Sequence, residues 1–348
     1  MYMDGFITWT TLWIYVVAFG VSATSLWLLL QTNSRLLAID VPNARSLHGA
    51  ATPRGGGVSI GVAFALCAAI VAASDGVSPR AVGLAALMVS VGVLGWLDDH
   101  LSLTVRSRLV AGAAVSAAAS ALVVSNERWV LFGGEYFLPI AFTLIPVALS
   151  LIWIKNLVNF MDGADGLVGL HSVIINIVLS HVFWVYQAPE LAVLSMGMAG
   201  AVSGFLLFNW APAKVFLGDS GSLILGMWLG LAMTLGASQY GIPVDVLLVI
   251  GGVLFFDATF TLLKRILKGE KFLQAHREHL YQRLVLGGWS HARVAVVTGG
   301  VSILLGCIAE IMILSPELSP WLFCGATAIL ALFTAYVMVR EKFQRARR

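Results

Sequence analysis

The chain has 348 residues, of which 59% are hydrophobic and 11% charged, and its mean hydropathy is +0.90. A soluble domain carries roughly 25% charged residues, so this composition excludes a water-soluble globular protein. The net charge of +3 gives no sign of a nucleic-acid partner, and we expect none. Cys67, Cys307 and Cys324 lie in apolar stretches without metal-ligand spacing, so we interpret them as packing residues.

Apolar stretches recur along the whole chain. They cover residues 6–30, 57–74, 81–97, 109–124, 136–154, 167–186, 191–208, 221–238, 244–263, 294–314 and 320–339. Each approaches the ~20 residues with which a helix crosses a bilayer, and a helix satisfies its own backbone hydrogen bonds in lipid. The first stretch is too long for a signal peptide and is expected to stay in the mature protein. We predict one all-α, polytopic membrane domain over residues 1–348, with about 11 spans.

Lysine and arginine divide sharply between alternate connecting segments. With the N-terminus outside, the segments that fall inside hold 19 of the chain's 21 basic residues. Cytoplasmic segments of membrane proteins carry this excess, so we predict an outside N-terminus and a cytoplasmic C-terminus. The clustered polar motifs lie in the same inside segments. Function is therefore expected at the cytoplasmic face of the membrane.

The first two polar motifs follow the first and third apolar stretches. A Pro- and Gly-rich turn carries His48 and Arg54, which is compatible with phosphate contact and equally with a structural loop. Asp98 and Asp99 end the third stretch. Adjacent carboxylates at a membrane surface are costly to desolvate and favour a shared cation or proton. The alternative for this pair is a solvated helix end.

The next two motifs are more specific. Asn159, Asp162 and Asp165 follow the fifth stretch among glycines, which release the chain from helix and let backbone N–H groups approach a ligand. Asn209 opens the other motif, and Asp219 stands between glycines just before the eighth stretch. A helix N-terminus there would offer N–H groups to a phosphate. Asp219 suits a metal ion and could also cap the helix.

The longest inside segment carries His276, Arg277 and His279, followed by Arg283. At helical spacing His276, His279 and Arg283 share one face, which suits a basic clamp on a diphosphate. A zinc pair or a solvated basic face is the alternative. Together the motifs gather several carboxylates and cations at one face. Hard cations prefer such oxygen ligands, so we expect Mg²⁺, or alternatively Mn²⁺, and phosphoryl transfer.

These motifs resemble those of the polyprenyl-phosphate N-acetylhexosamine-1-phosphate transferases of bacterial inner membranes. The resemblance rests on residues 45–48 with 53–57, 98–99, 159–167, 214–222 and the HRxH run 276–279. It implies transfer of an N-acetylaminosugar 1-phosphate from a UDP-sugar to a polyprenyl phosphate, such as undecaprenyl phosphate, with release of UMP. It also implies dependence on Mg²⁺. A homodimer stays open as the assembly.

Carried over motif by motif, the resemblance implies a role for each site residue. Asp219 is the principal metal ligand with Asp99 beside it, and Asp98 deprotonates or orients the lipid phosphate. Asp165 accepts a hydrogen bond from uracil, on which Phe216 stacks. The remaining substrate-binding residues are Asn159, Asp162, Asn209, His276, Arg277, His279, His48, Arg54 and Arg108.

The sequence departs from the family pattern at two places. The HRxH form is not the run of histidines of the muramoyl-pentapeptide translocase, which disfavours that donor and indicates the branch that initiates O-antigen chains. Arg106 and Arg108 stand where the family often has a lysine. A transporter and a lipid-carrier phosphatase stay open as other classes. Only Asp257 and Glu310 lie deep enough to line a transport pathway, and we interpret Asp257 as a packing or supporting residue.

Overall fold

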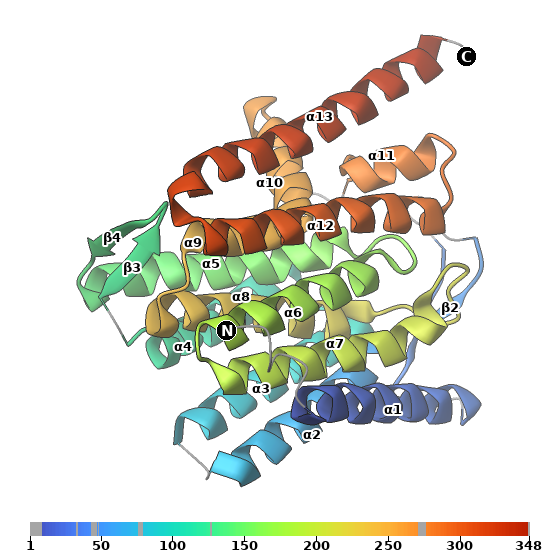
Figure 1. The fold of residues 1–348 in the computed structure, drawn as a ribbon. Coiled ribbons are helices and arrows are strands. Elements are labelled where there is room, and N and C mark those ends of the chain that lie inside the picture. Colours follow the sequence, from blue (N-terminus) through green and yellow to red (C-terminus); the bar gives the residue numbers. More distant parts are fainter. Residues whose placement is uncertain are drawn as a thin grey trace.

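A computed structural model describes residues 9–32, 34–42, 47, 49–75, 79–125, 127–270 and 276–346 of the chain. Nearly all of the regular structure is helical (Figure 1). The helices of the first half are α1 (Trp9–Gln31), α2 (Gly57–Asp75), α3 (Pro79–Leu101), α4 (Val105–Val123), α5 (Ile140–Met161) and α6 (Leu167–Val185). Those of the second half are α7 (Pro189–Asn209), α8 (Gly218–Tyr240), α9 (Val244–Ile250), α10 (Gly252–Leu267), α11 (Leu280–Leu286), α12 (His291–Leu314) and α13 (Ser319–Ala346), with the 3₁₀ turn η1 (Pro316–Leu318) before α13.

Two short antiparallel strand pairs lie at opposite ends of the helices. β1 (Ala38–Asp40) pairs with β2 (Thr52–Arg54) between α1 and α2. β3 (Arg128–Leu131) pairs with β4 (Gly134–Phe137) immediately before α5. Because Asp162 follows the far end of α5, the β3–β4 hairpin lies at the end opposite the polar motifs.

The prediction of an all-α polytopic membrane protein is confirmed. Among the described residues, eight helices are long and apolar enough to cross a membrane, and the pair α9 and α10 would make a ninth if it forms one broken span. Each predicted apolar stretch overlaps one of the helices, but α2 and α4 fall below the limits of length or hydropathy. The number of spans and their orientation remain predictions.

The structure differs from the predicted stretches at two places. Residues 244–263 were predicted as one apolar span, but the chain bends by 86° between α9 and α10. Gly251 and Gly252 lie at this bend, where glycine lowers helical stability. Residues from 155 onward were expected to form a loop, but α5 continues to Met161. Lys155 and Asn159 therefore project from a helix rather than from a flexible segment.

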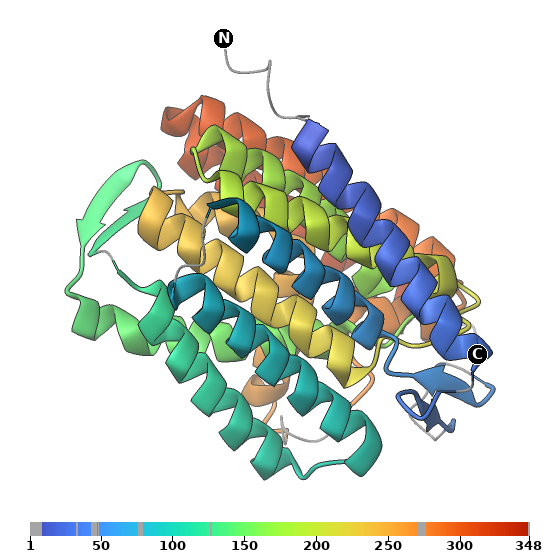
Figure 2. The same ribbon diagram turned by 90° about the horizontal axis from the view of Figure 1, so that it is seen from below.

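Helix α8 forms the centre of the bundle, and 94% of its apolar window is buried inside the protein. Figure 2 shows it in yellow, running between the other helices. Glycines let α3 and α5 approach it closely: a Cβ atom at Gly95 would lie 2.3 Å from the Asp219 carbonyl oxygen, and one at Gly226 would lie 2.7 Å from Lys155 Cα. The ends of α3, α5 and α7 and the starts of α4, α6 and α8 meet at one end of the bundle, so the polar motifs converge there.

Candidate active site

Asp99 is buried at the start of α8. Its Oδ1 accepts a hydrogen bond from the backbone N–H of Asp219 at 2.9 Å, and its Oδ2 accepts one from Ser220 at 3.0 Å. The N-cap residue of α8, Leu217, has no side chain that can bind these N–H groups. A side chain from α3 therefore caps α8 and holds the backbone of Asp219 in place. Gly218, with a φ of +74°, leaves the room, since a Cβ there would lie 2.6 Å from Asp99 Oδ2.

Asp98, at the same helix end, contacts α4. Its Oδ1 accepts the backbone N–H of Leu103 at 2.8 Å, which holds the turn between α3 and α4. Its Oδ2 lies 2.9 Å from Nη1 of Arg108, and the same nitrogen lies 3.4 Å from Oδ2 of Asp219. Arg108 therefore bridges two carboxylates that would otherwise repel each other.

Asp219 receives a further hydrogen bond from α5. Asn159 Nδ2 lies 2.6 Å from Asp219 Oδ1 and 2.9 Å from Ser222 Oγ. The Asp219 side chain is 24% exposed, whereas those of Asp98 and Asp99 are 4% and 0% exposed. Asp219 is thus the carboxylate of the three that a ligand can reach most easily.

Arg54 and Phe216 are joined through backbone pairing. Arg54 Nη2 donates to the Asp99 carbonyl oxygen at 2.8 Å, and its Nε lies 3.5 Å from Asp99 Oδ1. Arg54, the last residue of β2, also forms a parallel β-bridge with Phe216. In this bridge the Phe216 N–H donates to the Pro53 carbonyl oxygen at 2.8 Å. This pairing fixes the backbone of Phe216 just before the start of α8, three residues before Asp219. The ring of Phe216 is half-buried.

The loop after α5 is linked to the loop after α7. The backbone N–H of Ala213 donates to Asp165 Oδ2 at 3.1 Å, and His291 Nδ1 lies 3.3 Å from the same oxygen. Asn209 is buried and joins the loops, because its Oδ1 accepts from Gly166 N at 3.0 Å and its Nδ2 donates to the Val215 carbonyl. Sequence reasoning missed His291, since a lone histidine at a helix start carries no signal of its partner.

Asp162 lies outside the helices, at the C-cap of α5. Burial is the main cause that raises the pKa of its carboxyl well above the ordinary value, and the nearby charges of Asp219, Asp99 and Asp165 add to it. The structure therefore brings a fourth carboxylate, Asp162, into the electrostatic range of Asp219, and Asp165 acts on Asp162 in turn. Such a collection of acids favours a bound cation or a proton.

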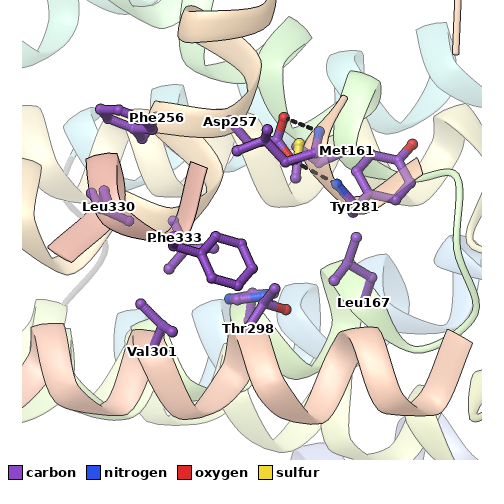
Figure 3. A pocket seen from close by; sticks show the side chains of 12 residues that line it. Met161, Leu167, Phe256, Asp257, Tyr281, Thr298, Val301, Leu330 and Phe333 are labelled. Carbon is purple, nitrogen blue, oxygen red and sulfur yellow. Dashed lines mark hydrogen bonds between the residues drawn. The ribbon is translucent and has the colours of Figure 1, made fainter. Parts of the chain in front are cut away.

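The HRxH segment is anchored by Asp257 of α10. Asp257 Oδ1 accepts the backbone N–H of Leu280 at 2.8 Å and lies 3.3 Å from His279 Nδ1, and Oδ2 accepts the N–H of Tyr281 at 3.2 Å. Figure 3 shows Asp257 and Tyr281 at a small, mostly apolar pocket beside Met161. The interpretation of Asp257 as a supporting residue thus agrees with its contacts.

Tyr281 joins this segment to α5, since its hydroxyl donates to the Phe160 carbonyl at 3.1 Å. His279 is buried, and the His276 ring lies 4.9 Å from it. Burial is the main cause that lowers the pKa of His276 to about 4, and His279 and Arg265 also contribute.

Arg277 lines a basic groove and not the carboxylate network. It lines a groove with Lys264, Lys268, Arg283 and Lys342, and the lining of this groove contains none of Asp98, Asp99 and Asp219.

Six of the predicted site residues thus form one contact network: Arg54, Asp98, Asp99, Arg108, Asn159 and Asp219. Phe216, Asp162 and Asp165 lie in the adjoining loops, Asn209 ends α7, and His276 and His279 lie in the segment held by Asp257. His48 lies outside the described residues.

The side chains at this site suit a hard cation that is held mainly by substrate phosphates and water and by few protein groups. Within the described residues, no group of three His, Cys, Asp or Glu side chains could hold a metal ion alone. Mg²⁺ is usually bound by one or two carboxylates together with substrate phosphates and water. The accessible carboxylate of Asp219 fits that pattern, whereas both oxygens of Asp99 are already occupied by backbone N–H groups.

Comparison with known proteins agrees with the fold and these motifs. Residues 81–237 match the model of glycosyl transferase family 4. A probable undecaprenyl-phosphate N-acetylglucosaminyl 1-phosphate transferase of Bacillus subtilis is 28% identical over 94% of each chain. A decaprenyl-phosphate N-acetylglucosaminephosphotransferase of Mycobacterium leprae is 30% identical over 89% of this chain and 85% of its own. A phospho-N-acetylmuramoyl-pentapeptide-transferase of Thermosynechococcus vestitus is 29% identical over 87% and 84%.

The three relatives match 87–94% of this chain, so the likeness is not confined to one motif. The chain is a polytopic membrane protein and belongs to glycosyl transferase family 4, the polyprenyl-phosphate N-acetylhexosamine-1-phosphate transferases.

Proposed function

We propose that the protein transfers an N-acetylaminosugar 1-phosphate from a UDP-sugar to a polyprenyl phosphate and releases UMP. The observation that carries this proposal is the accessible carboxylate of Asp219, held by Asp99, Asn159 and Arg108 where the polar motifs meet. The names of the relatives support the same acceptor class and the same kind of transferred group. The site would face the cytoplasm of a bacterial inner membrane.

The residues divide the work of the reaction between them. Asp98 takes or holds off the proton of the lipid phosphate, and Arg108 keeps Asp98 and Asp219 close while an anionic acceptor approaches. Asp219 would hold Mg²⁺, or alternatively Mn²⁺, and the bound ion supplies charge neutralisation to the phosphates. We give Asp99, predicted as a second metal ligand, the role of holding Asp219 in position instead, since both of its oxygens bind backbone N–H groups.

The nucleotide would bind over the loops that follow α5 and α7. Phe216, fixed by its pairing with β2, is placed to stack on uracil, and Asp165 is the proposed acceptor of a uracil hydrogen bond. His276 and His279 lie in the segment that docks on α5, and they would approach the diphosphate. Arg277 would join them only if its side chain turned out of the basic groove.

The donor sugar is the finer part of the proposal. The HRxH form of residues 276–279 favours an N-acetylated, often 6-deoxy, aminosugar over a muramoyl pentapeptide, as in initiation of O-antigen or a related polysaccharide. We propose no particular sugar within that class.

One assay tests the function. UMP release should require both lipid phosphate and a UDP-sugar, and it should be measured with UDP-GlcNAc, UDP-GalNAc and a 6-deoxy donor. UMP release without lipid phosphate would refute the transferase proposal. Release of inorganic phosphate from the lipid carrier would indicate a phosphatase, and uptake without chemical turnover would indicate a transporter.

A further inference from the structure

Lys155 is a buried cation in the middle of three packed helices. It lies on α5 and is 3% exposed. A Cβ atom added to Gly112 of α4 would lie 2.6 Å from its Nζ, so the glycine leaves room for the ammonium group. On the other side, Gly226 lets α8 pack against the Lys155 backbone. The ammonium group therefore lies in the junction of α4, α5 and α8.

The register of two helices places this group directly beneath the carboxylates. Lys155 precedes Asn159 by four residues on α5, and Gly112 follows Arg108 by four residues on α4, so each pair is stacked on one helix face. Asn159 and Arg108 both contact Asp219. Arg108 repels the ammonium group of Lys155, and Asp219 attracts it.

A packing role alone explains this residue poorly. An unpaired ammonium group is costly inside a membrane protein, and an apolar side chain of the same length would fill the space without that cost. Lys155 forms none of the ion pairs within 4 Å found among the described residues. The network above it holds three carboxylates, Asp98, Asp99 and Asp219, against the two guanidinium groups of Arg54 and Arg108. Asp162 also lies within the electrostatic range of Asp219, so the carboxylates outnumber the guanidinium groups and a further positive charge offsets part of the excess.

We propose that Lys155 is a positioning residue that supplies a buried counter-charge to the carboxylate cluster. This inference rests on the proposed function. A fixed positive charge beneath Asp219 weakens the binding of a divalent cation and strengthens the binding of phosphate groups. The site then releases its cation readily and retains affinity for two phosphorylated substrates at once.

The test measures binding without turnover. Lys155→Met and Lys155→Gln both remove the charge and keep most of the length of the side chain. Free Mn²⁺ is measured by electron paramagnetic resonance with the detergent-solubilised full chain, and UDP binding is measured without divalent cation. Both variants should bind Mn²⁺ roughly tenfold or more tightly than the wild type, and UDP more weakly. Lys268→Met is the control, because it removes a lysine that is 53% exposed and lines a groove that contains none of the three carboxylates.

Each outcome decides the matter. Mn²⁺ affinity equal to that of the wild type in either neutral variant overturns the inference, because both lack the same charge. An equal shift in Lys268→Met also overturns it, since the effect would then reflect net charge alone. UMP release by the wild type is measured in parallel. Absence of UMP release by the wild type would contradict the proposed function. Normal UMP release together with unchanged Mn²⁺ binding in the neutral variants would contradict only the role of Lys155.

Discussion

The carboxylate of Asp99, on α3, accepts the backbone N–H of Asp219 at 2.9 Å, so the helix that carries one acid is capped by another acid 120 positions away. Asp99 is completely buried, and Asp219 is not. The two residues therefore contribute to the site in different ways, and substitutions should separate them.

Asp99→Asn should destabilise the fold. An amide keeps one acceptor oxygen, but its NH₂ group would face one of the two N–H donors at the start of α8. We expect the free energy of unfolding to fall by about 1–3 kcal/mol, the usual cost of an unsatisfied buried polar group. Thermal unfolding in detergent measures this. A variant with wild-type stability would mean that α8 finds another cap.

Asp219→Asn should abolish activity and leave stability and membrane insertion nearly unchanged. A neutral amide cannot replace the charge of a carboxylate beside a divalent cation and two phosphates. The measurement is UMP release as a function of Mg²⁺ concentration, with unfolding temperature as the control. Substantial Mg²⁺-dependent turnover by this variant would contradict the proposed ligand.

Phe216→Ala should weaken binding of the UDP-sugar by roughly 1–3 kcal/mol, by analogy with base–aromatic stacking. Affinity for lipid phosphate should barely change, because the ring would contact only the nucleotide. Phe137→Ala, on the exposed hairpin at the other end of the bundle, is the matched control and should affect neither substrate. Equal losses for both substrates would show that Phe216 only packs the start of α8.

Asp98→Asn should lower the rate steeply with little effect on UDP-sugar affinity, because Asp98 would act on the acceptor. The second pKa of a phosphate monoester is about 6, so the lipid phosphate needs less help at higher pH. The defect should therefore shrink between pH 6 and 9. Asp99→Asn serves as the comparison, since its loss should not depend on pH in this way. A defect of constant size would leave Asp98 as a structural residue.

His276 should make the stability of the HRxH segment depend on pH. Its pKa is lowered to about 4 in the folded protein, against about 6.5 when unfolded. The folded state thus favours the neutral ring. The contribution of this ring to the free energy of unfolding is fully present above the unfolded pKa, and it is lost as the pH falls toward 4. Between pH 7.5 and 5, the unfolding temperature of His276→Gln should fall less than that of the wild type. Equal losses would show that another group titrates there.

The sequence was sufficient to predict the helices and the place where they carry function. Apolar stretches of spanning length can satisfy their backbone only as helices, and the polar motifs alternate with them so regularly that they must meet at one end of the bundle. Asp98, Asp99, Asn159 and Asp219 were all recognisable in this way. Each of these inferences depends on residues close together in the chain.

The tertiary structure alone decided how those residues divide their roles. Which acid caps α8 and which one faces a ligand depends on α3 packing against α8, a contact between residues 120 positions apart that no local pattern encodes. For the same reason Lys155 looked like a basic residue of a loop, and only the packing of α4 and α8 around it revealed a buried charge. The bend between α9 and α10 likewise places Asp257 under the HRxH segment. Periodicity and composition report exposure to lipid, whereas these roles follow from distances between helices.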